Sequence, residues 1–264
     1  RPPDPAPLPG PNEELPAVNT DPRILELALS PEVTLDDVLA LAGSRHPVAF
    51  ETVSLGGMDL DILQITDLPA YVDRLAQSSR PGEKLVLPFW AKLWPASFPL
   101  AMLLSRLTPQ PGGSSLLELG AGLGLCGLAA ARRGFQALVT DIEPEALLFI
   151  RASILKNGLE AQARPALLDI RSPGIEDRFE VIVGSEALYL PELHEPMANL
   201  LVNHLAGGPA SQALFSCDHC REAAPFFARI HQDFLIQRTQ STCRSSEGDS
   251  KTCVLYRMRS RTDA

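Results

Sequence analysis

The sequence predicts an α/β protein: a doubly wound, mostly parallel sheet with an antiparallel C-terminal strand and a small N-terminal α/β extension. Short apolar runs alternate with segments of helical character, which is typical of βαβ units and of a parallel sheet with helices on both faces. The five runs lie at residues 116–119, 137–140, 165–168, 180–184 and 212–216. Near the C-terminus, Phe234–Thr242 and Thr252–Arg259 flank the polar stretch 243–251 and favour a long antiparallel hairpin.

The N-terminal part of the chain begins with a segment that cannot build a core. Residues 1–22 are rich in proline and nearly free of large apolar side chains, so we expect a disordered tail. From residue 23 to residue 42 the pattern predicts two short helices. The second helix begins with a capping box, in which Thr34 and Asp37 satisfy free backbone groups.

A small hairpin and a further helix are expected before the main sheet. Val48–Ser54 and Met58–Ile65 alternate apolar and polar residues around a Gly-Gly pair, which predicts the hairpin. Leu68–Gln77 is expected to be helical. We therefore divide the chain into the tail, an accessory segment over residues 23–84 and a main domain over residues 85–264.

Composition narrows the class of protein. The 264 residues, 45% of them hydrophobic, are enough for one large domain with an extension, and no apolar run approaches the ~20 residues of a membrane span. The net charge of −9 argues against nucleic acid as a partner. Five irregularly spaced cysteines and the absence of a basic-then-apolar leader favour a reducing compartment, so we expect a cytoplasmic protein that starts, at Arg1, from a trimmed or truncated chain.

A glycine-rich turn is the most informative feature. The run Leu116–Gly134 ends a predicted strand, places glycines at 120, 122 and 124, and continues into an alanine-rich helix. Such a strand–turn–helix lets the backbone approach a nucleotide-like ligand closely and aims helix N–H groups at it. Asp141 closes the next apolar run, 17 residues after Gly124, where a carboxylate could bind a pair of ribose hydroxyls.

Four carboxylates occur at or near the ends of successive predicted strands. They belong to Glu118, Asp141, Asp169 and Glu186. Any one of them could simply favour a helix start, where the helix dipole suits negative charge. Because the carboxyl ends of parallel strands share one edge of a sheet, the four together predict a site there. The set suits a ligand with a ribose, an adenine amino group and a positive charge, and it does not suit a pyrophosphate.

The motifs at this edge resemble a known family. The run Glu118-x-Gly120-x-Gly122-x-Gly124 is similar to motif I of the seven-β-strand S-adenosylmethionine-dependent methyltransferases, which have a Rossmann-like sheet of seven strands. Pro88 to Pro95, followed by Leu100-Ala101, resembles the tryptophan-bearing helix that precedes motif I in methyltransferase family 16. Gly184 to Tyr189 resembles the [D/E]-x-x-[Y/F] signature of that branch of protein-lysine methyltransferases, whose members act on electron-transfer flavoprotein, chaperones and elongation factors. The resemblance covers roughly residues 85–260.

The resemblance implies S-adenosyl-L-methionine as cofactor and a role for each matching residue. The loop glycines would pass under the methionine and ribose parts, Asp141 would bind both ribose hydroxyls, and Asp169 with Ile170 would hold the adenine amino group. Trp94 would lie against the cofactor or serve as a core aromatic of its helix. Glu186 and Tyr189 would line the entrance for the acceptor side chain and act as the catalytic residues. The full cofactor-binding set is Trp94, Glu118, Gly120, Ala121, Gly122, Gly124, Asp141, Ile142, Asp169, Ile170 and Ser185.

The implied reaction is methyl transfer to a protein side chain, with lysine the preferred acceptor. Glu186 stands where Asp is commoner in the branch, and a histidine-modifying relative also carries Glu, so a protein-histidine methyltransferase is one alternative. A small-molecule methyltransferase and a non-catalytic cofactor-binding interaction module are the others. Cys217 and Cys220 form a C-x-x-C pair without a second pair at zinc-site spacing, so we expect no metal. We expect a monomer that acts on a protein, with no nucleic acid or membrane partner.

Overall fold

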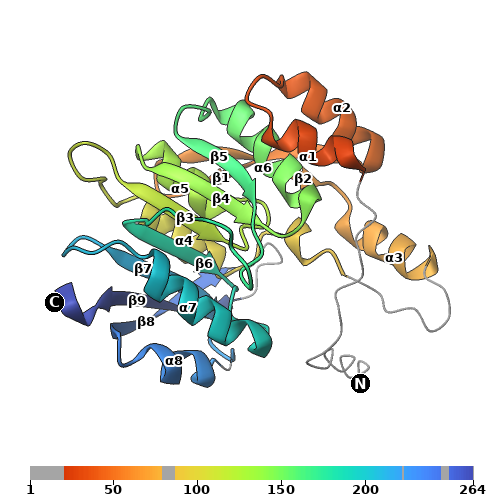
Figure 1. Ribbon diagram of the computed structural model, residues 1–264. Coiled ribbons are helices and arrows are strands. Elements are labelled where there is room, and N and C mark those ends of the chain that lie inside the picture. The colour runs from red at the N-terminus through yellow and green to blue at the C-terminus, as the bar shows by residue number, and fades with distance from the viewer. Residues whose placement is uncertain (1–20, 79–86, 222, 245–249, 264) are drawn as a thin grey trace.

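The computed structural model describes residues 21–78, 87–221, 223–244 and 250–263 (Figure 1). In chain order the elements are α1 (Pro22–Leu29), α2 (Leu35–Arg45), β1 (Val48–Ser54), β2 (Asp59–Ile65), α3 (Leu68–Ser78), η1 (Phe89–Ala91), α4 (Ser97–Leu104), β3 (Ser115–Leu119), α5 (Leu125–Arg132), β4 (Gln136–Asp141), α6 (Pro144–Asn157), β5 (Ala163–Leu167), β6 (Val181–Ser185), η2 (Pro191–Leu193), α7 (His194–His204), β7 (Gln212–Asp218), α8 (Ala224–Ile230), β8 (Phe234–Arg244), β9 (Ser250–Ser260) and η3 (Arg261–Asp263).

The main sheet has seven strands in the order β5-β4-β3-β6-β7-β9-β8, and β1 pairs with β2 in a separate hairpin. The strands β3 to β7 pair in parallel, whereas β9 runs antiparallel to both β7 and β8. The predicted fold class is confirmed. The C-terminal hairpin is longer than expected, because the cross-strand pairing continues to Arg244 and Ser250.

Successive side chains along the central strands pack into two separate cores, because neighbouring residues of a strand point to opposite faces of the sheet. In β3, Leu116 belongs to a core shared with α4, α5 and α6, whereas Leu117 belongs to a core shared with α7 and α8. In β6, Val183 and Ile182 divide in the same way. Helices therefore cover both faces of the sheet, as Figure 1 shows.

Of the N-terminal elements, α1, α2 and β2 pack against α6 (Figure 1). The backbone of the hairpin docks on this helix, since the Leu63 N–H donates to Ser153 Oγ over 3.0 Å and the Asp61 N–H donates to Asn157 Oδ1 over 3.0 Å. The buried side chains of α1, α2 and β2 join the same core as α6, so the segment shares its hydrophobic core with the sheet.

The predicted capping box of α2 is confirmed, with the Asp37 N–H donating to Thr34 Oγ1 and the Thr34 N–H donating to Asp37 Oδ2. Of the expected tail, residues 1–20 lie outside the described residues, whereas Pro22 is the first residue of α1 and Asp21 caps that helix. The expected boundary between residues 84 and 85 also lies outside the described residues.

The expectation of one tryptophan-bearing helix before motif I was wrong. Trp90 lies in the short turn η1, and Trp94 lies in a non-helical segment ahead of α4. The physical reason is local: Pro88 and Pro95 interrupt the backbone hydrogen-bond ladder that a continuous helix needs.

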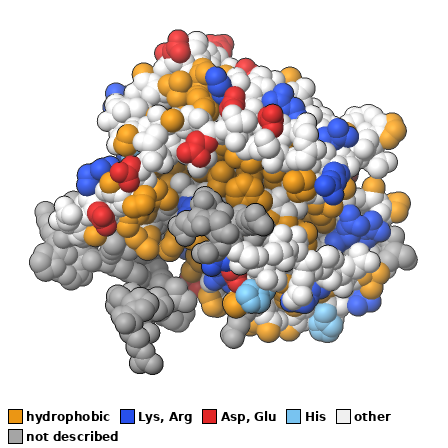
Figure 2. All heavy atoms as spheres, turned by 180° about the vertical axis from the view of Figure 1, so that it is seen from behind, with side chains coloured by type: hydrophobic (Ala, Val, Ile, Leu, Met, Phe, Trp, Pro, Cys, Tyr) orange, Lys and Arg blue, Asp and Glu red, His pale blue; other side chains and the backbone are white. Residues whose placement is uncertain are grey.

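The surface gives two further observations. No helix in the described ranges is long and apolar enough to cross a membrane. Seen from behind, hydrophobic side chains gather near the middle of the face, whereas charged side chains of both signs are dispersed around it (Figure 2).

Candidate active site

The glycine loop after β3 has the backbone that its sequence predicts. Gly120, Gly122 and Gly124 all have positive φ, at 59°, 56° and 78°. Gly122 must also stay small, because a Cβ there would lie 3.0 Å from the carbonyl oxygen of Trp90. The Ala121 N–H donates to the carbonyl of Thr140 over 2.9 Å, which ties the loop to β4. The loop is therefore fixed on both sides while its backbone stays open to a ligand.

Glu118 lies beneath this loop in the interior, with 2% of its surface exposed. Its Oε2 accepts a hydrogen bond of 2.7 Å from the Gly127 N–H at the start of α5, and a Cβ on Gly127 would lie 2.5 Å from that oxygen. Burial raises the pKa of Glu118 to about 8. The side chain thus joins β3 to α5, and this geometry supports the loop from below.

Asp141 ends β4 and faces the loop. Its Oδ2 accepts from the Gly122 N–H over 2.8 Å, and its Oδ1 accepts from the Glu143 N–H over 3.0 Å. Burial raises the pKa of this carboxyl, and three backbone N–H groups oppose the rise. A carboxylate can accept about four hydrogen bonds, so both oxygens keep capacity for ligand hydroxyls. The next residue, Ile142, is 41% exposed and offers an apolar surface beside that carboxylate.

Asp169 follows β5 and forms an ion pair with Arg171. The Arg171 Nη2 donates to Asp169 Oδ2 over 2.7 Å, and its Nε donates to Oδ1 over 2.9 Å. Hydrogen bonding from Arg171 lowers the pKa of Asp169, so the group is ionised at neutral pH. The adjacent Ile170 packs against the α7 side of the sheet and lines a surface hollow with Glu192 and Asn199.

Glu186 follows β6 and has an unusual backbone. Its φ of 53° is the one positive value at a non-glycine residue within the described ranges. The Glu186 N–H donates to the Ser216 carbonyl over 2.8 Å, and Ser216 Oγ donates to Ser185 Oγ over 3.1 Å. The carboxylate accepts from the Asp218 N–H over 2.9 Å and from Arg221 Nη2 over 3.1 Å. Burial raises the pKa of Glu186, and the charge of Arg221 opposes that rise.

Tyr189 stands between the Glu186 turn and the segment before β3. The residue is 38% exposed, and its ring lies 6.1 Å, centroid to centroid, from the ring of Phe89, which lies 6.1 Å from that of Trp94. Burial raises the pKa of Tyr189, and the negative charges of Asp141, Glu192 and Glu143 raise it further. The partly exposed rings of Phe89 and Tyr189 therefore lie at the edge of the sheet where these acidic side chains also lie.

The backbone that carries Tyr189 is held by a buried histidine. His194, 4% exposed, lies 3.0 Å through Nε2 from the carbonyl oxygen of Leu188. The indole N–H of Trp94 donates to the carbonyl of Phe89 over 2.9 Å, which fixes the opposite side of the aromatic group. Both sides are thus braced by side-chain to backbone hydrogen bonds.

The four predicted carboxylates do come together, in part. They occur at the same ends of β3, β4, β5 and β6, which are neighbours in the sheet, and the chain reverses its direction of winding between β3 and β6. Ligands bind at such switch points in open α/β sheets. The structure separates their orientations: Glu118 points inward to α5, Asp141 to the loop, Asp169 to Arg171 and Glu186 to the turn after β7.

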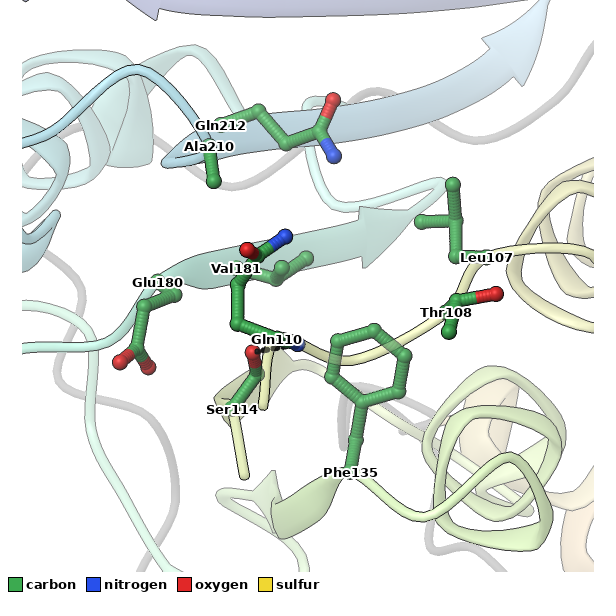
Figure 3. A pocket seen from close by; sticks show the side chains of 9 residues that line it. All are labelled: Leu107, Thr108, Gln110, Ser114, Phe135, Glu180, Val181, Ala210 and Gln212. Carbon is green, nitrogen blue, oxygen red and sulfur yellow. Dashed lines mark hydrogen bonds between the residues drawn. The ribbon is translucent and has the colours of Figure 1, made fainter. Parts of the chain in front are cut away.

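A small cavity of about 50 Å³ lies at the opposite edge of the sheet (Figure 3). Ser114, Glu180 and Gln212, which line it, precede or begin β3, β6 and β7. It is therefore at the amino ends of the strands, away from the glycine loop, and has no part in the site.

Three residues of the site escaped the sequence prediction. Gly127 carried a readable signal, because a glycine inside a predicted helix often marks close packing. Phe89 was within a recognised motif, but its 49% exposure is a tertiary property. Arg221 carried no signal at all, because only the turn after β7 brings it to Glu186.

The site has the features that a nucleoside with a positive charge requires. A Cβ at Gly122 would crowd the carbonyl oxygen of Trp90, so the loop stays narrow. The Asp141 carboxyl and the exposed Ile142 follow at the end of β4, and the negative charges of Asp141, Glu143 and Glu192 act on Tyr189. These residues fit S-adenosylmethionine, whose ribose, adenine and sulfonium match them in chemistry.

Comparison with known proteins agrees with this fit. The chain is 30% identical to "Protein N-lysine methyltransferase METTL21A" of Danio rerio, over 56% of the chain and 69% of that protein. It is 31% identical to the Mus musculus protein of the same name, over 56% and 70%. It is 28% identical to "Calmodulin-lysine N-methyltransferase" of Arabidopsis thaliana, over 46% and 43%.

A solved structure and a family pattern complete the comparison. The fold resembles that of PH1948 from Pyrococcus horikoshii, described as a candidate RNA methyltransferase, with a TM-score of 0.51 and 14% identity over 74% of this chain and 98% of that one. Residues 89–233, more than half of the chain, match the family described as "Lysine methyltransferase". The chain therefore belongs to this family of lysine methyltransferases, and its methyl donor is S-adenosylmethionine.

Proposed function

We propose that this chain transfers a methyl group to the ε-amine of a lysine in a protein, at the edge of the sheet between the loops after β3 and β6. The observation that carries the proposal is that Glu186, whose carboxylate Arg221 holds, stands in the same loop after β6 as Tyr189, whose ring lies beside that of Phe89, which in turn lies near Trp94. S-adenosylmethionine supplies a methyl group that is already activated. The residues of the chain are left with binding, orientation and control of charge.

We infer the following cofactor contacts. Asp141 holds the ribose hydroxyls with the oxygen lone pairs that Gly122 and Glu143 leave open. Ile142 lies against the adenine, and Asp169 accepts from the adenine amino group while Arg171 keeps it ionised. Glu118 acts indirectly, through Gly127 and the loop. The backbone of Gly120, Ala121 and Gly124, the side chain of Ser185 and the ring of Trp94 complete the pocket.

The acceptor amine must lose its proton before it can attack, and its unperturbed pKa is about 10.4. An apolar entrance lowers that pKa, because burial disfavours the ammonium form. The rings of Phe89 and Tyr189 provide such an entrance. With the cofactor bound, the carboxylate of Glu186 would orient the amine and stabilise the positive charge that develops on its nitrogen as the N–C bond forms and the methyl–sulfur bond of the cofactor breaks. The chemistry needs no metal.

The partner is a protein, because the family and the relatives above modify lysine in proteins. We further propose a monomer in the cytoplasm. Cys126, Cys217 and Cys220 form no disulfide, which suits a reducing compartment, and the net charge of −9 does not suit nucleic acid. The segment 23–84 is proposed to shape the entrance, and the packing of its elements α1, α2 and β2 on α6 supports that proposal.

The test is methylation by the protein and by its Glu186→Gln variant. Labelled S-adenosylmethionine is incubated with an extract of the source cells, and the labelled residue is identified after hydrolysis. Turnover of Glu186→Gln should fall roughly a hundredfold or more, while calorimetric cofactor affinity changes less than about threefold. Tyr189→Phe should lose less, because its ring still lines the entrance.

A matched control is Glu176→Gln, in the exposed loop before β6, which should keep the wild-type rate. Label found on histidine would replace lysine as the acceptor. Glu186→Gln at the wild-type rate would remove Glu186 from the acceptor site.

A further inference from the structure

The motif Cys217-Asp218-His219-Cys220, which the methyl-transfer site leaves unexplained, forms the turn at the end of β7. Within it the Cys220 N–H donates to Asp218 Oδ1 over 2.9 Å, and the Arg221 N–H donates to the Asp218 carbonyl over 3.0 Å. The His219 N–H donates to the Thr252 carbonyl of β9 over 3.1 Å. These bonds reverse the chain and return Arg221 toward the sheet edge.

The turn meets the strained residue of the site. A left-handed backbone is unfavourable for a side chain such as that of Glu186, and it persists only where the surroundings fix it. Three hydrogen bonds with β7 and the turn do so: the Glu186 N–H donates to the Ser216 carbonyl, the Asp218 N–H donates to Glu186 Oε1, and Arg221 Nη2 donates to Glu186 Oε2. Arg221 alone among these donors is a charged side chain.

The Glu186 carboxylate has one positively charged side chain among its described neighbours in β7 and the turn after it. Its side chain is only 13% exposed, and the groups that face it from β7 and the turn are Cys217, Asp218 and Arg221. Burial and the negative charge of Asp218 oppose ionisation, whereas the charge and hydrogen bond of Arg221, and after them the hydrogen bond from the Asp218 N–H, favour the ionised form. A carboxyl that lost this partner would hold its proton to a higher pH.

We propose that Arg221 is a positioning residue for methyl transfer: its guanidinium holds the Glu186 carboxylate aimed and ionised, ready to receive the amine of the acceptor. The inference rests on the proposed function of Glu186. The turn Asp218–Arg221 therefore serves to hold the Glu186 carboxylate. Its Asp, His and Cys side chains could suggest a metal site, but we assign the turn this role instead. One oxygen of Glu186 is fixed by a backbone N–H and the other by Arg221.

The first test needs no acceptor. The side-chain carboxyl of Glu186 is titrated by NMR in the whole protein labelled with ¹³C-glutamate, and its signal is assigned by loss in Glu186→Gln. Arg221→Gln should raise the titration midpoint by about one pH unit, and Arg221→Lys, which keeps the charge, by less. The control Arg229→Gln removes the surface ion pair between Arg229 on α8 and Asp233 and should leave the midpoint unchanged.

The second test uses the rate of labelled methyl incorporation into proteins of the source-cell extract, from about pH 5 to about pH 9. At each pH the Arg221→Gln rate is divided by the wild-type rate, so that the pH dependence of the acceptor's own ionisation, which is the same for both proteins, drops out. This ratio should be about tenfold below one at low pH and rise toward one at high pH, with cofactor affinity unchanged. An unchanged NMR midpoint, or a rate ratio that is flat with pH, would overturn the role of Arg221. Failure of the wild type to label lysine would refute the proposed function instead, and the NMR midpoint would still judge Arg221.

Discussion

Replacing Gly127 by alanine tests the packing under the glycine loop. In an exposed helix this change normally stabilises by roughly 0.5–1 kcal/mol, because alanine has the higher helix propensity. At Gly127 the new Cβ would lie 2.5 Å from Glu118 Oε2 and 2.6 Å from Val139 Cγ2. Both neighbours are buried, so one of them must move. Crowding in a packed core costs about 1–3 kcal/mol, and loss of the Gly127–Glu118 hydrogen bond adds about 1–3 kcal/mol.

The net expectation is a loss of roughly 1–5 kcal/mol, since the costs exceed the gain in propensity. The matched control is Gly43→Ala in α2, where no atom lies within 4 Å of the new Cβ and the small gain should appear. Urea midpoints of the two variants and the wild type measure the difference, with Tm as a second measurement. If Gly127→Ala is as stable as Gly43→Ala, the inference that Gly127 of α5 packs too closely on Glu118 of β3 to accept a Cβ is refuted.

Three further predictions follow from the same structure. Asp141→Ala should weaken S-adenosylmethionine binding at least tenfold in calorimetry, because it would remove the two charge-assisted hydrogen bonds that we propose to the ribose and would leave the Gly122 N–H without its partner; unchanged affinity would refute the proposed ribose contact. Glu118 has a pKa of about 8 in the fold against 4.5 ordinarily, so its contribution to stability is present below about pH 4.5 and is lost as pH rises to about 8. Relative to Glu118→Gln, the wild-type free energy of unfolding should therefore fall by up to about 5 kcal/mol across that pH window. Urea unfolding at a series of pH values measures it, and the same pH dependence in both proteins would contradict this prediction. Removing residues 1–20, ahead of the Asp21 cap of α1, should leave cofactor binding and activity intact; loss of binding would show that the segment is structural.

Much of the fold followed from local pattern. Strands with period-two or continuous apolar runs, a capping box at Thr34 and a glycine loop at 120–124 are set by backbone sterics and by burial, which act over a few residues. The number of strands in the sheet came only from the resemblance to the family, and their pairing order came only from the structure. The helix expected around Trp94 failed because two prolines outweighed the apolar pattern.

The sequence by itself determined which carboxylates meet at one edge of the sheet, because parallel strands place their carboxyl ends together. Only the tertiary structure decided where each one points. Glu118 and Glu186 are both acidic residues near strand ends, yet one is sealed under α5 and the other is held by Arg221, 35 residues away in the chain. Hydrogen bonds and burial between distant segments set these orientations and the charge of each group, and no local pattern encodes them.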